Sequence, residues 1–225
     1  MIATPGRLVD HLRSQPKLLW ASSILVLDEA DRMLDMGFAP QLKTIFRHLP
    51  KQRQTMMFSA TFPPEIKRLA NELLHKPVEA SVGQPSTPIQ KINQTVIQTT
   101  QKQKNEVLLD ELNTREGSVL IFTRTKHRTD RLSKYLGSYG YRVTRIHGNR
   151  TQGQRKQAIE GFRSGQFRIL VATDIASRGL DIPHIEHVVN FDLPQAPEDY
   201  IHRIGRTGRA GAEGSAISFI TPEDH

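Results

Sequence analysis

The chain has 225 residues, of which 37% are hydrophobic and 24% are charged, a composition typical of a globular protein with one large or two small cores. It contains no cysteine, which excludes disulfides, thiolate zinc sites and a thiol nucleophile and fits a reducing compartment, so we expect a cytoplasmic protein. No apolar run reaches the roughly 20 residues that a membrane-spanning helix needs, and the first residues lack the pattern of a signal peptide.

The formal net charge of +8 favours a polyanionic partner such as nucleic acid, although many basic proteins bind none. The charge is not localised. Residues 1–91 carry 12 basic and 8 acidic residues and residues 92–225 carry 19 and 15, so each part has a net charge of +4. A binding face must therefore be built by folding and not by a basic tail.

The first part of the chain alternates short apolar runs with helical patterns. Ile24–Leu27 is a short apolar run that we interpret as a buried strand, and residues 55–58 form a second one. Between them, apolar residues at helical spacing predict a helix over 38–49, and a further helix is predicted over 64–74 with proline in its first turn.

Residues 81–91 contain two prolines and a glycine but few large apolar side chains. This composition is typical of a linker. We therefore predict a first domain over 1–80 and a second domain over 92–225.

After the linker the alternation of strands and helices resumes. The predicted strands lie at 94–99, 119–122, 142–146, 169–172, 187–190 and 216–220. The predicted helices lie at 104–113, 126–136, 152–162 and 197–204. This order predicts an α/β fold with a parallel sheet covered on both faces, in which ligands bind beyond the carboxyl ends of the strands.

The first motif is Asp28-Glu29-Ala30-Asp31, directly after the first predicted strand. One carboxylate at a strand end can hold Mg²⁺ through water while a second polarises an attacking water. An acidic surface loop is the alternative.

The second motif, Ser59-Ala60-Thr61, follows the next predicted strand. Its hydroxyls could bond to neighbouring site residues. On the tripeptide alone, Thr61 as the N-cap of the following helix is the better interpretation.

The third motif, residues 172–181, begins at a strand end and contains Asp174, Gly179 and Asp181. A strand-end carboxylate can accept a hydrogen bond from a ribose hydroxyl. Alternatively, Asp174 only caps a helix.

The fourth motif is His202-Arg203-Ile204-Gly205-Arg206-Thr207-Gly208-Arg209. Guanidinium groups match phosphate oxygens and can stabilise the charge that develops in phosphoryl transfer. A generic basic loop is the alternative.

Taken together, these motifs resemble the DEAD-box RNA helicases of bacterial type over essentially the whole chain. The matches occur in the order of that family: residues 4–7, 28–31, 59–61, 120–123, 147–148 with Gln152 and Arg155, 173–181 and 202–209. The resemblance implies two RecA-like parallel-sheet domains, the first incomplete and the second complete.

The resemblance also implies roles for individual residues. Asp28 would bind Mg²⁺ through water and Glu29 would be the catalytic base, while Asp31 and His202 would bridge the two domains together with Ser59 and Thr61. On the nucleotide, the resemblance implies arginine fingers at Arg206 and Arg209 and cofactor contacts at Gly179 and Asp181. The sugar-phosphate backbone of RNA would be contacted by Thr4, Gly6, Arg7, Thr123, Gly148, Arg155 and Thr173. For Arg155, an ordinary surface charge of its helix is the alternative.

The sequence lacks one motif that ATP hydrolysis needs. A phosphate loop reads G-x-x-x-x-G-K-[ST], and no glycine of this chain is followed by lysine. We therefore expect an amino-terminally truncated first domain whose sheet exposes an apolar edge.

Two functions remain open at this stage. One is an ATP-dependent RNA helicase with ATP and Mg²⁺ as cofactors, of which this chain alone is inactive. The other is a catalytically silent RNA-binding fragment. In either case we expect a monomer that binds RNA without sequence preference, and an unrelated dehydrogenase is disfavoured because no G-x-G-x-x-G opens a helix.

Overall fold

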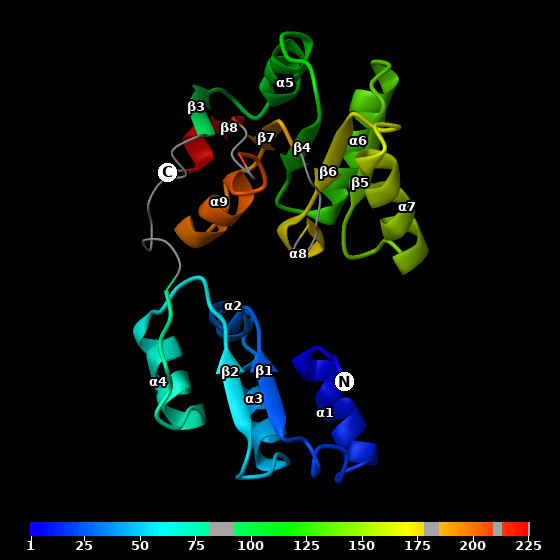
Figure 1. Cartoon of the computed structure of the whole chain (residues 1–225). Helices are drawn as coiled ribbons and strands as arrows, with labels where there is room; N and C mark the ends of the chain where they lie inside the picture. The colour runs from blue at the N-terminus through cyan, green and yellow to red at the C-terminus, as the bar shows by residue number, and fades with distance from the viewer. Residues whose placement is uncertain (82–91, 178–184, 209–212, 225) are drawn as a thin grey trace. The chain divides into compact units, whose positions relative to one another are not determined.

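The computed structural model of the chain describes residues 1–81, 92–177, 185–208 and 213–224. The chain divides into two compact units, Met1–Thr87 and Pro88–His225 (Figure 1). Most of the predicted linker, at 82–91, lies outside the described residues. In the described residues no helix is long and apolar enough to cross a membrane.

The first unit is a small parallel sheet with helices packed on it. Its elements are α1 (Pro5–Ser14), β1 (Ile24–Leu27), α2 (Ala30–Asp35), α3 (Ala39–Arg47), β2 (Gln54–Met57) and α4 (Pro64–Leu73). The two strands pair in parallel, with Ile24 opposite Gln54 and Leu27 opposite Met57. Its core cluster is formed mainly by residues of α1, α3 and the segments that follow these helices: Leu12, Leu19, Ile45 and Leu49.

Both apolar runs of this unit form strands as predicted, but the prediction that these strands are buried was wrong. Only Leu27 of β1 is buried, whereas Ile24 and Val26 are 57% and 51% exposed, and Phe58 after β2 is 54% exposed. In the described residues β1 pairs only with β2, and the inward-facing Leu25 packs on the α1–α3 cluster. One face of the sheet thus exposes apolar side chains, whereas the expectation above concerned an apolar edge and stays a prediction.

The second unit is a six-stranded sheet in which every pair is parallel. The strands are β3 (Ile92–Gln98), β4 (Val119–Phe122), β5 (Val143–Ile146), β6 (Ile169–Ala172), β7 (His187–Asn190) and β8 (Gly214–Ile220), in the order β3-β8-β7-β4-β6-β5. The helices are α5 (Lys104–Asn113), α6 (Lys126–Ser138), α7 (Gln152–Arg163), α8 (Asp174–Ser177) and α9 (Pro197–Ile204), followed by the 3-10 helix Pro222–Asp224.

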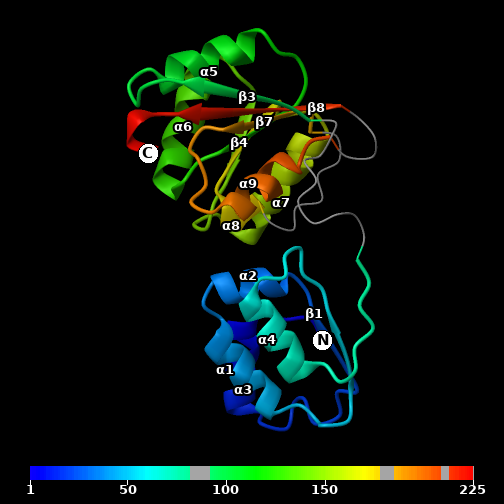
Figure 2. The same cartoon turned by 90° about the vertical axis from the view of Figure 1, so that its left-hand side faces the viewer.

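This sheet is buried on both faces because its strands alternate between two core clusters. Leu120 and Phe122 of β4 pack with residues of α7, α8 and α9, whereas Val119 and Ile121 pack with residues of α5 and α6. Figure 2 shows these two sets of helices on opposite sides of the sheet. All four residues of β4 and of β6 are buried, which explains their unbroken apolar sequences.

The predicted strands and helices are confirmed, with ends that differ by no more than two residues. Local signals explain several of the helix starts. Thr125 accepts a hydrogen bond from the Arg128 amide at α6, and Thr151 forms a capping box with Gln154 at α7. The sequence analysis missed α1, α2 and α8. Helices α2 and α8 have six and four residues, which is too short for a helical period to be recognised.

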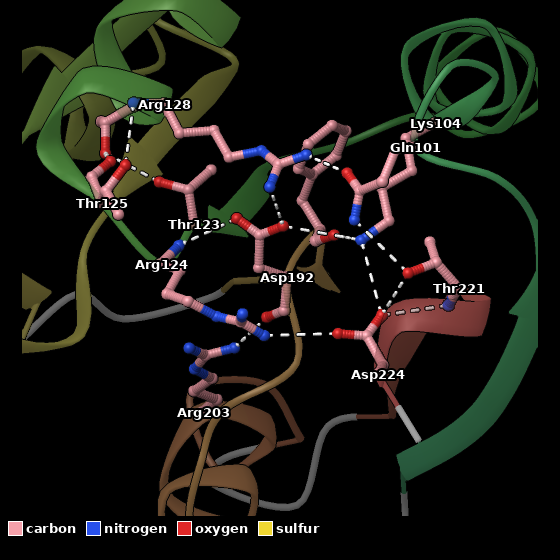
Figure 3. A network of polar contacts seen from close by, with 12 residues as sticks. Gln101, Lys104, Thr123, Arg124, Thr125, Arg128, Asp192, Arg203, Thr221 and Asp224 are labelled. Carbon is pink, nitrogen blue, oxygen red and sulfur yellow. Dashed lines mark hydrogen bonds and ion pairs between the residues drawn. The ribbon is translucent and has the colours of Figure 1, made fainter.

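A buried ion-pair network ties the carboxyl ends of β4, β7 and β8 together (Figure 3). The Lys104 side chain is 1% exposed, and its Nζ donates to the Phe191 carbonyl at 2.8 Å. The same ammonium group lies 3.5 Å from Asp192 Oδ1 and 3.9 Å from Asp224 Oδ2. Burial lowers the pKa of Lys104 below its ordinary value, against the opposing attraction of the two aspartates.

Replacing Lys104 with Met should lower the free energy of unfolding by about 3 kcal/mol, because two buried carboxylates each lose a cationic partner. Chemical denaturation of the purified chain measures this. Lys102→Met is the matched control, since Lys102 is exposed two residues earlier, and its effect should stay within about 0.5 kcal/mol. Equal effects of the two changes would contradict the stabilising role of the network.

Candidate functional site

The carboxylates of Asp28 and Glu29 are presented to solvent by a strained turn after β1. Both residues are exposed, and the Glu29 amide donates to Asp28 Oδ1 at 3.0 Å. Glu29 has a φ of 51°, in the left-handed region of backbone conformation that residues other than glycine rarely adopt. Backbone strain of this kind clusters at functional sites, so it supports a chemical role for these two carboxylates.

Asp31 is the buried centre of a hydrogen-bond network that joins the segments after β1 and β2. Its Oδ2 accepts from the amide and the hydroxyl of Thr61 at 2.8 and 2.9 Å, and its Oδ1 accepts from the Arg32 amide at 2.9 Å. Ser59 Oγ accepts from the Asp31 amide at 3.1 Å and donates to the Thr61 carbonyl at 2.8 Å. The structure thus brings Asp31, Ser59 and Thr61 together.

These contacts decide between the two interpretations of the Ser59–Thr61 segment. Pro63 is the N-cap residue of α4 and no side chain caps this helix, so Thr61 is not the cap. Burial alone would raise the pKa of Asp31, but the hydrogen bonds from Thr61 and Arg32 outweigh it and hold the pKa below its ordinary value. Asp31 is therefore ionised at neutral pH and anchors the loop.

In the second unit, three segments that the sequence analysis assigned to one ligand lie next to one another. Thr123 follows β4, Thr173 follows β6 and Gly148 lies two residues after β5, and these three strands are neighbours in the sheet. The Thr123 amide donates to the Ala172 carbonyl at 3.0 Å, and the Thr173 amide donates to the Ile146 carbonyl at 3.2 Å.

Their side chains differ in accessibility. Thr123 is 0% exposed and its Oγ1 shares a 2.7 Å hydrogen bond with Thr129 Oγ1, so its hydroxyl does not reach the surface. Gly148 is exposed, Thr173 is half-buried and Arg155 is half-buried on α7. Of the three strand-end residues, Thr173 and Gly148 are therefore the ones that can contact a ligand directly.

Helix α9 and the turn after it carry the basic motif. His202 and Arg206 are half-buried, and the Arg206 amide donates to the Arg203 carbonyl at 3.1 Å. Thr207 is buried, and its Oγ1 donates to the carbonyls of Ile185 and Glu186, which fixes the turn to the segment before β7. The predicted site residues Gly179, Asp181 and Arg209 lie outside the described residues.

The amino-terminal predicted residues lie at the start of α1. Thr4 is its N-cap residue and makes no side-chain capping bond, and Gly6 and Arg7 lie in its first turn. Unpaired amides at the start of a helix attract phosphate groups, so this arrangement suits a polyanion.

The sequence analysis missed two residues that organise the second unit, Asp192 and Arg203. The Asp192 carboxylate pairs with Lys104 and Arg128 and accepts from the Arg124 amide, and its backbone carbonyl accepts from Arg203 (Figure 3). A hydrophobic pattern gives no sign of such contacts. For Asp192 the available signal was an aspartate two residues beyond a buried strand, and for Arg203 it was the position inside the fourth motif.

The residues around Asp28 suit a magnesium ion that keeps most of its water ligands, and they do not form a site with several protein ligands. No group of three or more acidic or histidine side chains is placed to hold a metal ion in the part of the chain that the structure describes. Mg²⁺ usually keeps several waters and takes one or two carboxylates together with substrate phosphates. The exposed Asp28 carboxylate meets that requirement.

Two family models match the chain. The model described as DEAD/DEAH box helicase matches residues 1–69, and the model described as helicase conserved C-terminal domain matches residues 103–211.

Three solved structures illustrate the similarity. Dbp5 of S. cerevisiae bound to RNA and ADP BeF3 is 34% identical with a TM-score of 0.86, and the match covers 99% of this chain and 59% of Dbp5. A DEAD box protein from the hyperthermophile Methanococcus jannaschii is 37% identical with a TM-score of 0.59 (99% and 60% covered). The yeast DEAD-box splicing factor Prp28 is 38% identical with a TM-score of 0.58 (97% and 50% covered).

The chain thus spans half to three fifths of the length of these structures. The predicted fold class is confirmed: the two parallel sheets belong to two RecA-like domains, of which the first is partial.

Replacing Asp31 with Asn should destabilise the unit Met1–Thr87 by about 1–3 kcal/mol at neutral pH, because the charge-assisted hydrogen bonds to Thr61 are weakened. The folded pKa is lowered, so this stabilisation is complete above the ordinary value of 3.8 and is lost as the pH falls through the lower folded value. Urea denaturation at neutral pH and well below 3.8 should show the two proteins converging in acid. Asp10→Asn, in an exposed ion pair, is the control and should change little. A gap between the Asp31 variant and the parent that does not narrow in acid would argue against this role.

Proposed function

Because the chain belongs to the DEAD-box helicase family, we propose that it is part of an ATP-dependent RNA helicase, an enzyme that couples ATP hydrolysis to RNA unwinding or to remodelling of RNA–protein complexes. The observation that carries the proposal is the placement of the acidic and hydroxyl motifs after the parallel strands of the first RecA-like unit, together with an arginine motif on α9 and the turn after it in the second. The bacterial type of the family stays a prediction.

For the first unit we propose the following division of labour. Asp28 holds Mg²⁺ through water, and Glu29, whose side chain is solvent-exposed, acts as the general base for the attacking water. For Asp31, held by Ser59 and Thr61, the proposed role is the one that the family resemblance implies, a bridge between the two domains together with His202 when nucleotide is bound.

For the second unit the proposed nucleotide contacts are arginine fingers at Arg206 and Arg209, with Asp181 at the ribose and Gly179 as a further cofactor contact. The anchoring of Thr207 supports this role, because it fixes the turn next to Arg206. A guanidinium group that is held in place stabilises developing phosphate charge without having to reorganise.

The proposed RNA contacts are Thr4, Gly6, Arg7, Gly148, Arg155 and Thr173. Thr123 joins this set by shaping the loop after β4, since its own hydroxyl is buried. Contacts of this kind read the sugar-phosphate backbone and not the bases. Dbp5, whose structure contains RNA and ADP BeF3, supports both ligand classes. We propose a monomeric, cytoplasmic protein with ATP and Mg²⁺ as cofactors.

The sequence contains no phosphate loop, so a second candidate is specific to these 225 residues: RNA binding without ATP hydrolysis. The amides and lysine that cradle the β- and γ-phosphates in related enzymes have no counterpart in this sequence.

The purified chain should bind single-stranded RNA with an affinity that falls about ten-fold between about 50 and 200 mM salt, because phosphate contacts release counterions. Fluorescence anisotropy with homopolymers of different bases should show affinities within about three-fold of one another. A strong preference for one sequence, or an affinity that does not depend on salt, would contradict the proposal. Measurable RNA-dependent ATP hydrolysis by the chain would contradict the second candidate.

In a form of the protein that also carries a phosphate loop, Glu29→Gln should reduce RNA-stimulated ATP hydrolysis by about 10²–10⁴-fold, because the attacking water loses its base. Nucleotide affinity should be unchanged. The control is Glu72→Gln, which alters an exposed glutamate on α4 and should leave turnover intact. Retained turnover in the Glu29 variant would remove this residue from the catalytic role.

A further inference from the structure

Arg203 is a buried cation of the second unit with hydrogen-bond partners for each of its three guanidinium nitrogens. Its side chain is 3% exposed, and its Nε and Nη2 donate to the two carboxylate oxygens of Asp174 at 2.6 and 2.7 Å. Its Nη1 donates to Asn190 Oδ1 at 3.1 Å. The same Nη1 donates to the Asp192 carbonyl at 2.6 Å (Figure 3). The guanidinium carbon also lies 4.9 Å from the centre of the Phe122 ring.

These contacts join three strand ends to one helix. Phe122 ends β4, Asn190 ends β7 and Asp174 lies two residues beyond β6, whereas Arg203 itself belongs to α9. The bonding pattern requires a planar group with several fixed donors. A lysine at the same position keeps the charge but cannot make a two-pronged bond to Asp174 and also reach Asn190 and Asp192.

Asp174 is the residue next to Thr173, which the proposed function places on the RNA backbone. The Thr173 amide already donates to the Ile146 carbonyl, so Thr173 has its hydroxyl left to offer to a ligand. Helix α8, which begins at Asp174, has four residues and cannot hold its own conformation without tertiary contacts. Of these contacts, the ion pair with Arg203 is two-pronged and largely buried.

We propose that Arg203 is a positioning residue for RNA binding: through Asp174 it fixes the hydroxyl of Thr173 at the edge of the sheet. The inference rests on the proposed function and adds to it a residue that does not itself touch RNA. The same tie links the Thr173 segment to α9, which carries His202 and leads into Arg206.

The test compares Arg203→Lys with a matched control, Arg168→Lys, in the 225-residue chain. Arg168 donates to the carbonyls of Leu112, Arg115 and Gly117, away from Thr173, and its replacement also preserves net charge. Both variants should unfold at lower temperature than the parent. RNA affinity is measured by anisotropy well below the lowest unfolding temperature. It should fall by about three- to ten-fold for Arg203→Lys, as expected for one lost hydrogen bond to RNA. It should stay unchanged for Arg168→Lys.

Two further readings separate positioning from a general structural role. The slope of log affinity against log salt should be the same for Arg203→Lys and the parent, because a hydroxyl contact releases no counterions. Thr173→Val should weaken binding by a similar factor, and the double variant should be no weaker than the weaker single variant, because both changes remove one contact.

Asp174→Asn provides a second variant in case Arg203→Lys does not fold. It removes a negative charge, which by electrostatics alone would strengthen RNA binding, so weaker binding would support the positioning role. Parent-like affinity in both folded variants, or fully additive effects with Thr173→Val, would overturn the inference. If the parent chain itself binds no RNA, the proposed function fails instead, and the two outcomes are thus distinguishable.

Discussion

Parallel strand pairing is the constraint on which the sites of this chain depend. Every strand pair in the described residues runs parallel, so within each sheet all the strands end at the same edge. Polar residues that are separated in sequence by tens of positions, such as Asp31 and Thr61, are brought within hydrogen-bond distance by this pairing alone. The helices between the strands fix the spacing, and the residues just after the strands are free to carry chemistry.

Burying charged groups at the strand ends is energetically unfavourable, and ion pairs among these same groups offset the penalty. Lys104, Arg128 and Arg203 are balanced by Asp174, Asp192 and Asp224, of which all but Arg128 and Asp174 have buried side chains. These cations therefore contribute little to the +8 net charge that a distant polyanion would sense. An electrostatic field that attracts the proposed RNA partner must come from exposed groups such as Arg7, which lie outside this network.

Periodicity was enough to predict the α/β class, both sheets and most of the helices, because buried parallel strands such as β4 and β6 are apolar on every residue. Burial in the first unit was predicted wrongly, since an apolar run does not reveal whether a sheet has partners on both faces, as Ile24 and Val26 show. The motifs located Asp28, Asp31 and Thr173 correctly at strand ends. They could not show that Thr123 points inward or that Arg203 holds Asp174, because both facts depend on long-range packing and not on local pattern.

At Glu29, the left-handed backbone conformation lowers the stability of the fold, whereas the side chain supplies a carboxylate with a proposed chemical role. A glycine there would relieve on the order of 1 kcal/mol of backbone strain and would lose the carboxylate. Selection for thermal tolerance alone would therefore favour a variant that keeps the fold and lacks the proposed base, whereas selection for the proposed ATP hydrolysis would retain the strained residue. In an engineered variant of this chain, a gain in thermal stability from a substitution at position 29 would therefore indicate that the carboxylate and its proposed catalytic role have been lost.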